Sequence, residues 1–257
     1  MFTDLKIEST SKMKYIYYLL AFIVFVIVVH EMWPRRITIG DTWVINLEKD
    51  KTRWEHIQAQ GLDIRRWNAT YGKQITIDEA KKWGVDSLIT RSTKTNKMVH
   101  NNVGEVGCWM SHKQLLTHLA TQNVPDNYGH LILEDDVDLH PGFMDEFEVI
   151  AKQIPRNWDM IYLSMNRPVG NTRLSSRILK ANTLKDIAKG NWGTQAYMVR
   201  HGSIQKILKH LRFMTHAVDV QYNFAFDDLD AYIIDPILIK LNPILSKEST
   251  IVSDRSY

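Results

Sequence analysis

The sequence predicts an α/β domain with a mostly parallel sheet flanked by helices, because short apolar runs alternate with segments of helical periodicity. The clearest apolar run, residues 131–133, leads directly into four carboxylates within five positions. A continuous run of this kind is typical of a strand that is buried on both faces of a parallel sheet. The composition agrees, since 44% hydrophobic and 24% charged residues are globular values.

Length and charge narrow the classes of protein that fit. A chain of 257 residues suits one large domain plus an accessory segment. The formal charge of +3 is compatible with an anionic ligand or a membrane surface, but it is too weak to indicate nucleic-acid binding. The single cysteine, Cys108, excludes an intrachain disulfide and any zinc site built from cysteines.

The N-terminal segment predicts a membrane anchor at residues 15–33, after a polar tail at 1–14 and before a stalk at 34–41. The uncharged stretch from Tyr15 to Val29 would span ~22 Å as a helix, or ~28 Å if the helix continued to Trp33, against a hydrocarbon core of ~30 Å. A cleaved signal peptide is the alternative, but no small-x-small cleavage motif follows Val29. We expect a single-pass protein of the secretory pathway or cell envelope, with its N-terminus in the cytoplasm.

Residues 42–257 form the predicted catalytic domain. Strands are expected at 42–47 and 62–67, with a helix from Asp50 to Gln60 between them that Asp50 caps and Gly61 ends. Thr76 and Glu79 form a capping box for a short helix that ends at Gly84. Residues 90–102 are expected to be a loop. The helix from 104 to 122 has a buried stripe formed by Trp109, Leu116 and Leu119.

The second half of this domain continues the alternation. Phe143, Phe147, Ile150 and Ile154 recur at helical spacing, and Pro155 ends that helix. Strands are expected at 158–163 and 194–199, followed by a helix whose apolar residues begin at Ile204. The polar segment 166–191 is long enough to be a lid or an acceptor-binding loop, and with 90–102 we expect it to select donor and acceptor.

The acidic cluster after the apolar run predicts a metal site. If the extended geometry continues, Glu134, Asp136 and Asp138 share one face and Asp135 points to the other. Two carboxylates ~4 Å apart repel by about 1 kcal/mol even in bulk water, so the group must take up protons or hold a cation. An all-oxygen ligand set suits Mg²⁺ or Mn²⁺, with Ca²⁺ possible. The alternative is a solvated acidic loop. An EF-hand is excluded because Phe147 would occupy its twelfth position.

Four stretches occur together in one order along the chain. They are Val44–Leu47 with Arg53, Arg66–Ala69 with Gly72, Gly104–Cys108 with Ser111 and His112, and Leu133–Val137. With these stretches the chain resembles glycosyltransferase family 25, the lipopolysaccharide and procollagen galactosyltransferase group, over about residues 42–240. The resemblance implies a GT-A type fold and an inverting transfer of galactose or glucose from a UDP-sugar. The acceptor would be a glycan, a lipopolysaccharide or a glycoprotein hydroxyl.

The resemblance and the residue chemistry together assign roles. Asp136, assisted by Asp138 or Glu134, would hold Mn²⁺ or Mg²⁺ and offset the charge of the departing diphosphate. Asp219 is the candidate catalytic base, although Ala217 replaces a proline that is frequent in the family, and Asp227 and Asp228 lie close by in sequence. The candidate donor-binding residues are Asn46, Arg53, Glu105, His112 and Asp135.

Structural roles compete with several of these assignments. Gly104 and Gly107 would equally allow a tight turn, and Glu105 would favour the positive end of the following helix. His112 lies one turn after Cys108, so a zinc pair is conceivable. A structural histidine is the favoured reading because no further ligand follows at zinc spacing. Asn46 and Arg53 have capping and surface roles as alternatives.

Two other classes of function remain in competition with a glycosyltransferase. A glycoside hydrolase would use the carboxylates as an acid–base pair, but it needs two carboxyls across the scissile bond and not a sequential cluster. A non-catalytic nucleotide-sugar-binding protein would keep the fold with an idle metal site. The uninterrupted Glu134–Asp136 element argues against the second class.

Overall fold

The computed structural model describes residues 14–25, 37–85, 89–91, 98–100, 103–184, 186 and 190–248. The chain divides into two compact units, residues 1–36 and residues 37–257. In the first unit, residues 14–25 are helical. In the described part of the chain, no helix combines the length and apolar character needed to cross a bilayer. Residues 26–33 of the predicted anchor lie outside the described residues, so the anchor stays a prediction.

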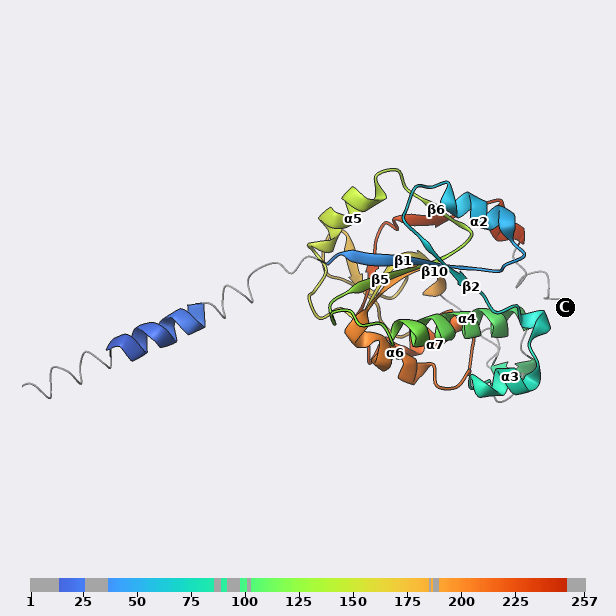
Figure 1. Cartoon of the computed structure of the whole chain (residues 1–257), viewed down its shortest axis with the longest axis horizontal. Coiled ribbons are helices and arrows are strands. Elements are labelled where there is room, and N and C mark those ends of the chain that lie inside the picture. Colours follow the sequence, from blue (N-terminus) through green and yellow to red (C-terminus); the bar gives the residue numbers. More distant parts are fainter. Residues whose placement is uncertain are drawn as a thin grey trace, which may run out of the picture. The chain divides into compact units, whose positions relative to one another are not determined.

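The second unit is built on an eight-stranded sheet with the order β2-β1-β5-β10-β7-β11-β9-β8 (Figure 1). Its strands are β1 (Ile39–Asn46), β2 (Arg65–Asn68), β5 (Gly129–Glu134), β7 (Met160–Asn166), β8 (Thr172–Arg173), β9 (Ile178–Lys180), β10 (Trp192–Arg200) and β11 (Ala231–Ile234). Strands β10 and β9 run antiparallel to their neighbours, and the other six share one direction. The prediction of a mostly parallel sheet is therefore confirmed.

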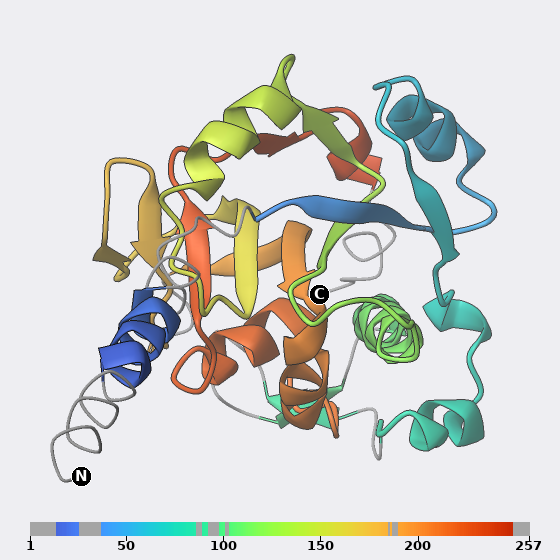
Figure 2. The ribbon, with the colours of Figure 1, turned by 60° about the vertical axis from the view of Figure 1, so that its left-hand side comes forward.

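Helices cover both faces of this sheet (Figures 1 and 2). One face carries α2 (Lys51–Gln58), α5 (Phe143–Ala151) and a small sheet of β6 (Val137–Leu139) and β12 (Ile239–Leu241). The other carries α4 (Val103–Leu119), α6 (Ile204–His210) and α7 (Val218–Ala225). The remaining described elements are α3 (Ile77–Lys82), the paired strands β3 (Ile89–Arg91) and β4 (Met98–His100), and the 3₁₀ turns η1 (Gly72–Gln74), η3 (His201–Ser203) and η4 (Leu245–Glu248).

Two cores explain why the central strands are apolar without interruption. Trp43, Ile45 and Ile132 pack in the cluster that includes α4 and α6 residues. Val44 and Leu131, which alternate with them, pack in the cluster that includes α5 residues. Side chains alternate across a strand, so a strand covered on both faces needs apolar residues at every position.

Predictions from short sequence motifs were confirmed at some positions and wrong at others. The capping box forms, because Thr76 Oγ1 accepts from the Glu79 amide while Glu79 accepts from the Thr76 amide. Asp50 stands at the N-cap of α2 but makes no side-chain capping bond. The predicted loop at 90–102 instead contains β4 and part of β3, and the polar segment 166–191 contains the paired β8 and β9.

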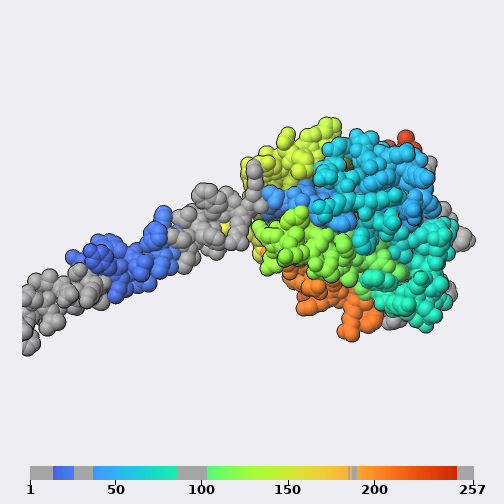
Figure 3. Space-filling view, in the orientation of Figure 1, coloured from blue at the N-terminus to red at the C-terminus, as the bar shows by residue number. Residues whose placement is uncertain are grey.

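A glycine allows α4 to lie against the segment that follows β2. A Cβ added at Gly107 would stand 2.6 Å from the Thr70 carbonyl oxygen and 2.8 Å from the Gly72 amide nitrogen. These are backbone atoms, so only glycine permits this approach. Gly107 lies inside α4 and not in a turn, which replaces the tight-turn interpretation for this residue. Figure 3 shows the cyan segment and the green helix adjoining on one face.

Candidate functional site

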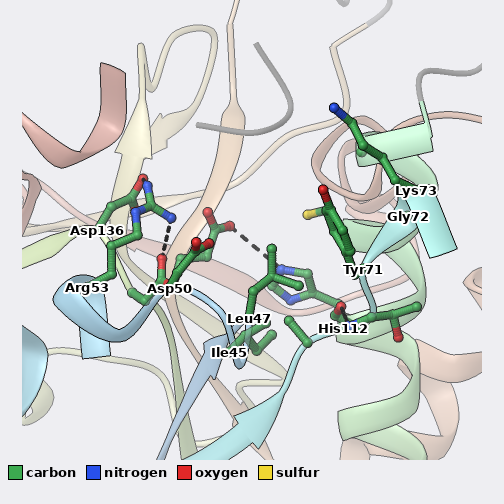
Figure 4. Close-up of a pocket in the computed structure, with 16 residues that line it drawn as sticks. Ile45, Leu47, Asp50, Arg53, Tyr71, Gly72, Lys73, His112 and Asp136 are labelled. Carbon is green, nitrogen blue, oxygen red and sulfur yellow. Dashed lines mark hydrogen bonds and ion pairs between the residues drawn. The ribbon is translucent and has the colours of Figure 1, made fainter. Parts of the chain in front are cut away.

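A pocket opens at the carboxyl ends of β1 and β5 (Figure 4). The chain leaves β1 through α2 towards β2 on one side, while β5 pairs with β1 on the other. Such a divergence of connections leaves a crevice where α/β proteins bind ligands. The lining comes from the end of β1, residues 69–73, the first turns of α4, and Glu134, Asp135 and Asp136.

The strongest contacts in the pocket join Arg53 of α2 to two adjacent carboxylates. One guanidinium nitrogen bonds Asp135 Oδ1, and another lies 2.9 Å from Asp136 Oδ2. The second nitrogen also donates to the Leu245 carbonyl oxygen at 3.0 Å. Both aspartate side chains are at most 10% exposed, so these ion pairs are largely shielded from water.

Asn46 holds the same carboxylate from the end of β1. Its Nδ2 donates to Asp135 Oδ2 at 2.6 Å and to the Asp50 carbonyl oxygen at 3.2 Å. Asn46 is 1% exposed, so this amide is a fixed part of the pocket wall. The structure therefore brings together the predicted residues Asn46, Arg53, Asp135 and Asp136.

Burial raises the pKa of both aspartates in spite of Arg53. Desolvation raises the pKa of Asp135 to about 6, against the opposing effects of Arg53 and Asn46. Desolvation, with the negative charge of Glu134, raises the pKa of Asp136 to about 7. The one positive charge of Arg53 therefore does not balance the two negative charges that Asp135 and Asp136 carry when both are ionised.

One oxygen of the pair has no hydrogen-bond partner. Asp136 Oδ1 is buried and accepts no bond from any described residue. A buried carboxylate oxygen in this state is costly unless a proton or a cation meets it. Carboxylate oxygens are the ligands that Mg²⁺ and Mn²⁺ prefer, so the chemistry of Asp136 and Asp135 fits a hard divalent cation.

Glu134 belongs to a different wall of the pocket. Thr194 Oγ1 donates to Glu134 Oε1 at 2.6 Å, and His112 Nε2 lies 3.6 Å from the same oxygen. Although burial acts to raise it, the pKa of Glu134 is lowered, because His112, Thr194 and the Arg53 charge favour the anion. The partners of Glu134 therefore favour its ionised form.

The expected alternation of the acids is wrong, because β5 ends at Glu134 and the chain turns at residues 135–136. As a result Asp135 and Asp136 both meet Arg53, whereas Asp138 does not line the pocket. Asp138 lies in β6 and contacts His56 Nε2 at 2.9 Å and Asn242 Nδ2 at 3.1 Å. The structure gives no support to Asp138 as a metal ligand.

A polar face of α2, which continues to Gln60 just beyond the end of the helix, holds the turn in place; sequence reasoning found Arg53 but missed His56 and Gln60. Arg53, His56 and Gln60 follow one another at spacings of three and four residues and so share one face. Gln60 Nε2 donates to the Val137 carbonyl oxygen at 2.8 Å, and Gln60 Oε1 accepts from the Leu139 amide. The helical spacing of these polar residues could have indicated the face from the sequence. Only the fold shows that the face contacts the turn after β5 and strand β6.

Two predicted residues, Glu105 and Asp219, are not among the residues that line the pocket. Glu105 is in the first turn of α4, where its charge suits the helix dipole. Asp219 is in the first turn of α7, where its carboxylate accepts from the Val220 amide at 2.8 Å and the Gly193 amide at 3.1 Å. Burial, with the nearby charge of Glu134, raises the pKa of Asp219.

Tyr71 and Lys73 also line the pocket and were not singled out from the sequence. Figure 4 shows Tyr71 and His112 on one side, and Arg53 and Asp136 on the other. The Lys49 ammonium lies 5.0 Å from the centre of the Tyr71 ring, a cation–π contact. No apolar periodicity marks residues 70–73, so only their position after β2 could have indicated them.

Residues 40–222 match glycosyltransferase family 25, described as a lipopolysaccharide biosynthesis protein family. The chain belongs to glycosyltransferase family 25. The match covers every stretch that carried the resemblance, so that prediction is confirmed. The chain is also 24% identical, over 247 residues, to the procollagen lysyl hydroxylase and glycosyltransferase of Acanthamoeba polyphaga mimivirus. This alignment covers 85% of the chain but only 27% of the viral protein.

The raised pKa of Asp136 makes the stability of this glycosyltransferase pH-dependent when no metal is added. An acid whose pKa is higher in the folded than in the unfolded protein stabilises the fold only while it is protonated. The folded protein therefore loses stability as pH rises from about 4 to about 7. We therefore expect Asp136→Asn to raise the free energy of unfolding at pH 8 by at least about 1 kcal/mol, with little gain at pH 4. Urea unfolding in EDTA measures this.

Asp145→Asn, an exposed substitution on α5, is the matched control and should show no such pH-dependent gain. A variant at Asp136 that is less stable than the wild type at pH 8 would contradict the burial argument.

Proposed function

We propose that this chain is a metal-dependent, inverting glycosyltransferase that moves galactose or glucose from a UDP-sugar to an acceptor hydroxyl. The observation that carries the proposal is the pair of buried carboxylates at the end of β5, with one oxygen of Asp136 lacking a partner. Asp136 and Asp135 would hold Mn²⁺ or Mg²⁺. When bound, the ion supplies Lewis-acid stabilisation of the departing diphosphate.

The other walls of the pocket suit a nucleotide-sugar. Ile45, Leu47 and Tyr71 provide apolar and aromatic surface for a base, and the Arg53 guanidinium beside Asp136 provides positive charge for phosphate. Arg53 and Asn46 fix the orientation of Asp135 before a ligand arrives. Such preorganisation is commonly worth several kcal/mol of the barrier, on the order of 3 kcal/mol for one well-placed donor.

Asp219 is the proposed catalytic base that takes the acceptor hydroxyl proton. Its raised pKa makes its carboxylate a better proton acceptor than Glu134, whose pKa is lowered by His112 and Thr194. Asp227 and Asp228 are exposed and follow the end of α7, which argues against either as the base.

The family description favours a lipopolysaccharide acceptor, and the name of the viral relative favours a hydroxyl on a protein. A glycan remains the third class of acceptor. A hydrolase is not favoured, because Asp135 and Asp136 share one guanidinium and do not face each other across a gap.

The metal and donor requirements give a direct test. The purified full chain should bind and slowly hydrolyse UDP-galactose or UDP-glucose with Mn²⁺, and EDTA should remove the activity. Asp136→Asn should lower kcat/KM at least about 100-fold, because the unpartnered oxygen is lost. Isothermal titration and UDP release measure both effects, with Asp145→Asn as the control. Full activity in EDTA would overturn the metal requirement, and no binding of any UDP-hexose would overturn the function.

The base assignment is tested by a second pair of variants. Asp219→Asn should lower kcat for transfer by about 100-fold to 10,000-fold while donor binding changes little, because proton removal occurs only during reaction. Asp227→Asn, at an exposed position, should behave as the wild type. A larger loss in Glu134→Gln than in Asp219→Asn, at equal donor affinity, would move the role to Glu134.

We also propose that residues 15–33 anchor the enzyme in a secretory-pathway or cell-envelope membrane, with the N-terminus in the cytoplasm. The fifteen residues from Tyr15 to Val29 carry no charge, which supports this placement. Deletion of residues 1–36 should move the protein from the membrane pellet to the supernatant after an alkaline wash. A full-length chain that is released by the same wash would contradict the anchor.

A further inference from the structure

Three side chains of different chemistry meet in one wall of the pocket. Cys108 and His112 lie one turn apart on α4, and Glu134 ends β5. One ligand atom from each lies within 4.8 Å of those from the other two. All three residues line the pocket, and Figure 4 shows His112 on the side opposite Arg53 and Asp136.

The imidazole of His112 makes no hydrogen bond on the side that faces this cluster. His112 is 0% exposed, and its Nδ1 lies 2.8 Å from the Tyr197 hydroxyl oxygen. Its Nε2 has no hydrogen-bond partner in the described part of the chain, since the Glu134 oxygen stands 3.6 Å away. Buried ring nitrogens are rarely left in this state, which indicates a missing ligand.

We propose that Cys108, His112 and Glu134 form a zinc site that is separate from the Asp135–Asp136 cation site. Sulfur, imidazole and carboxylate are the three donor types that Zn²⁺ takes, whereas Mn²⁺ and Mg²⁺ prefer oxygen. Three protein ligands leave a fourth position for water or another small molecule, as at catalytic zinc centres.

The geometry requires little movement of the imidazole and the carboxylate. Two ligands at about 2.0–2.1 Å from zinc stand roughly 3.4 Å apart in a tetrahedron, close to the 3.6 Å between His112 Nε2 and Glu134 Oε1. The Tyr197 hydroxyl can accept the Nδ1 proton, which leaves the Nε2 lone pair for the metal. Binding releases the thiol proton of Cys108 to solvent.

The single cysteine provides a clean test that involves no sugar donor, so it stands whether or not the proposed function holds. In the native full chain, Zn²⁺ should slow alkylation of Cys108 by iodoacetamide at least about tenfold, and it should have little effect on the unfolded chain. Glu134→Gln and His112→Gln should weaken the zinc affinity derived from this protection by about 10-fold to 100-fold or more. Asp136→Asn is the matched control and should keep the protection.

Co²⁺ provides a second measurement that separates loss of folding from loss of the site. The folded wild type should give a thiolate-to-cobalt charge-transfer band and the intense visible bands of a tetrahedral ion. Cys108→Ser, checked for folding by circular dichroism, should lose the charge-transfer band. No protection in the wild type, no thiolate band with Co²⁺, or loss of protection in Asp136→Asn equal to that in Glu134→Gln would overturn the proposal.

Discussion

The contact between Arg53 and the two aspartates is the constraint on which the site depends. Asp135 and Asp136 are nearly buried at the end of the central strand β5, and one guanidinium meets both. Buried carboxylates without such a partner would be destabilising, so α2 has to pack where it delivers Arg53. That requirement fixes α2 over the end of β1, and with it the position of Asn46 and one wall of the pocket.

A single turn divides the acidic cluster among three sets of partner residues. Before the turn, Glu134 meets Thr194 and the side of His112. Within it, Asp135 and Asp136 meet Arg53, and after it Asp138 meets His56 and Asn242. Residues of the same chemistry that are close in sequence therefore have different partners, because each points into a different environment.

The sequence predicted the parts of the fold that depend on short-range patterns. The apolar run before Glu134 identified β5, and the apolar stripe of α4 is buried at Trp109. The turn at residues 135–136 escaped prediction, because nothing local distinguishes it from a continuing strand. The contact of His56 with Asp138 and the position of Glu134 beside Cys108 and His112 also escaped prediction. In both cases the partners come from distant segments that only the packed sheet brings together.

Charge balance explains why this pocket favours a divalent cation if its ligand is a nucleotide-sugar. Asp135, Asp136 and Glu134 carry three negative charges when ionised, and Arg53 is the cation in direct contact with two of them. A diphosphate brings further negative charge into the same space, and Lys73 is the other cationic residue lining it.

Repulsion between such groups grows as water is excluded, so protonation of Asp136 or a bound cation must restore the balance. Protonation would remove a ligand oxygen, whereas a divalent ion would add positive charge beside the carboxylates and the phosphates. For a phosphate ligand the second solution would stabilise the complex more strongly, and this is the physical argument for the metal proposed at Asp135 and Asp136.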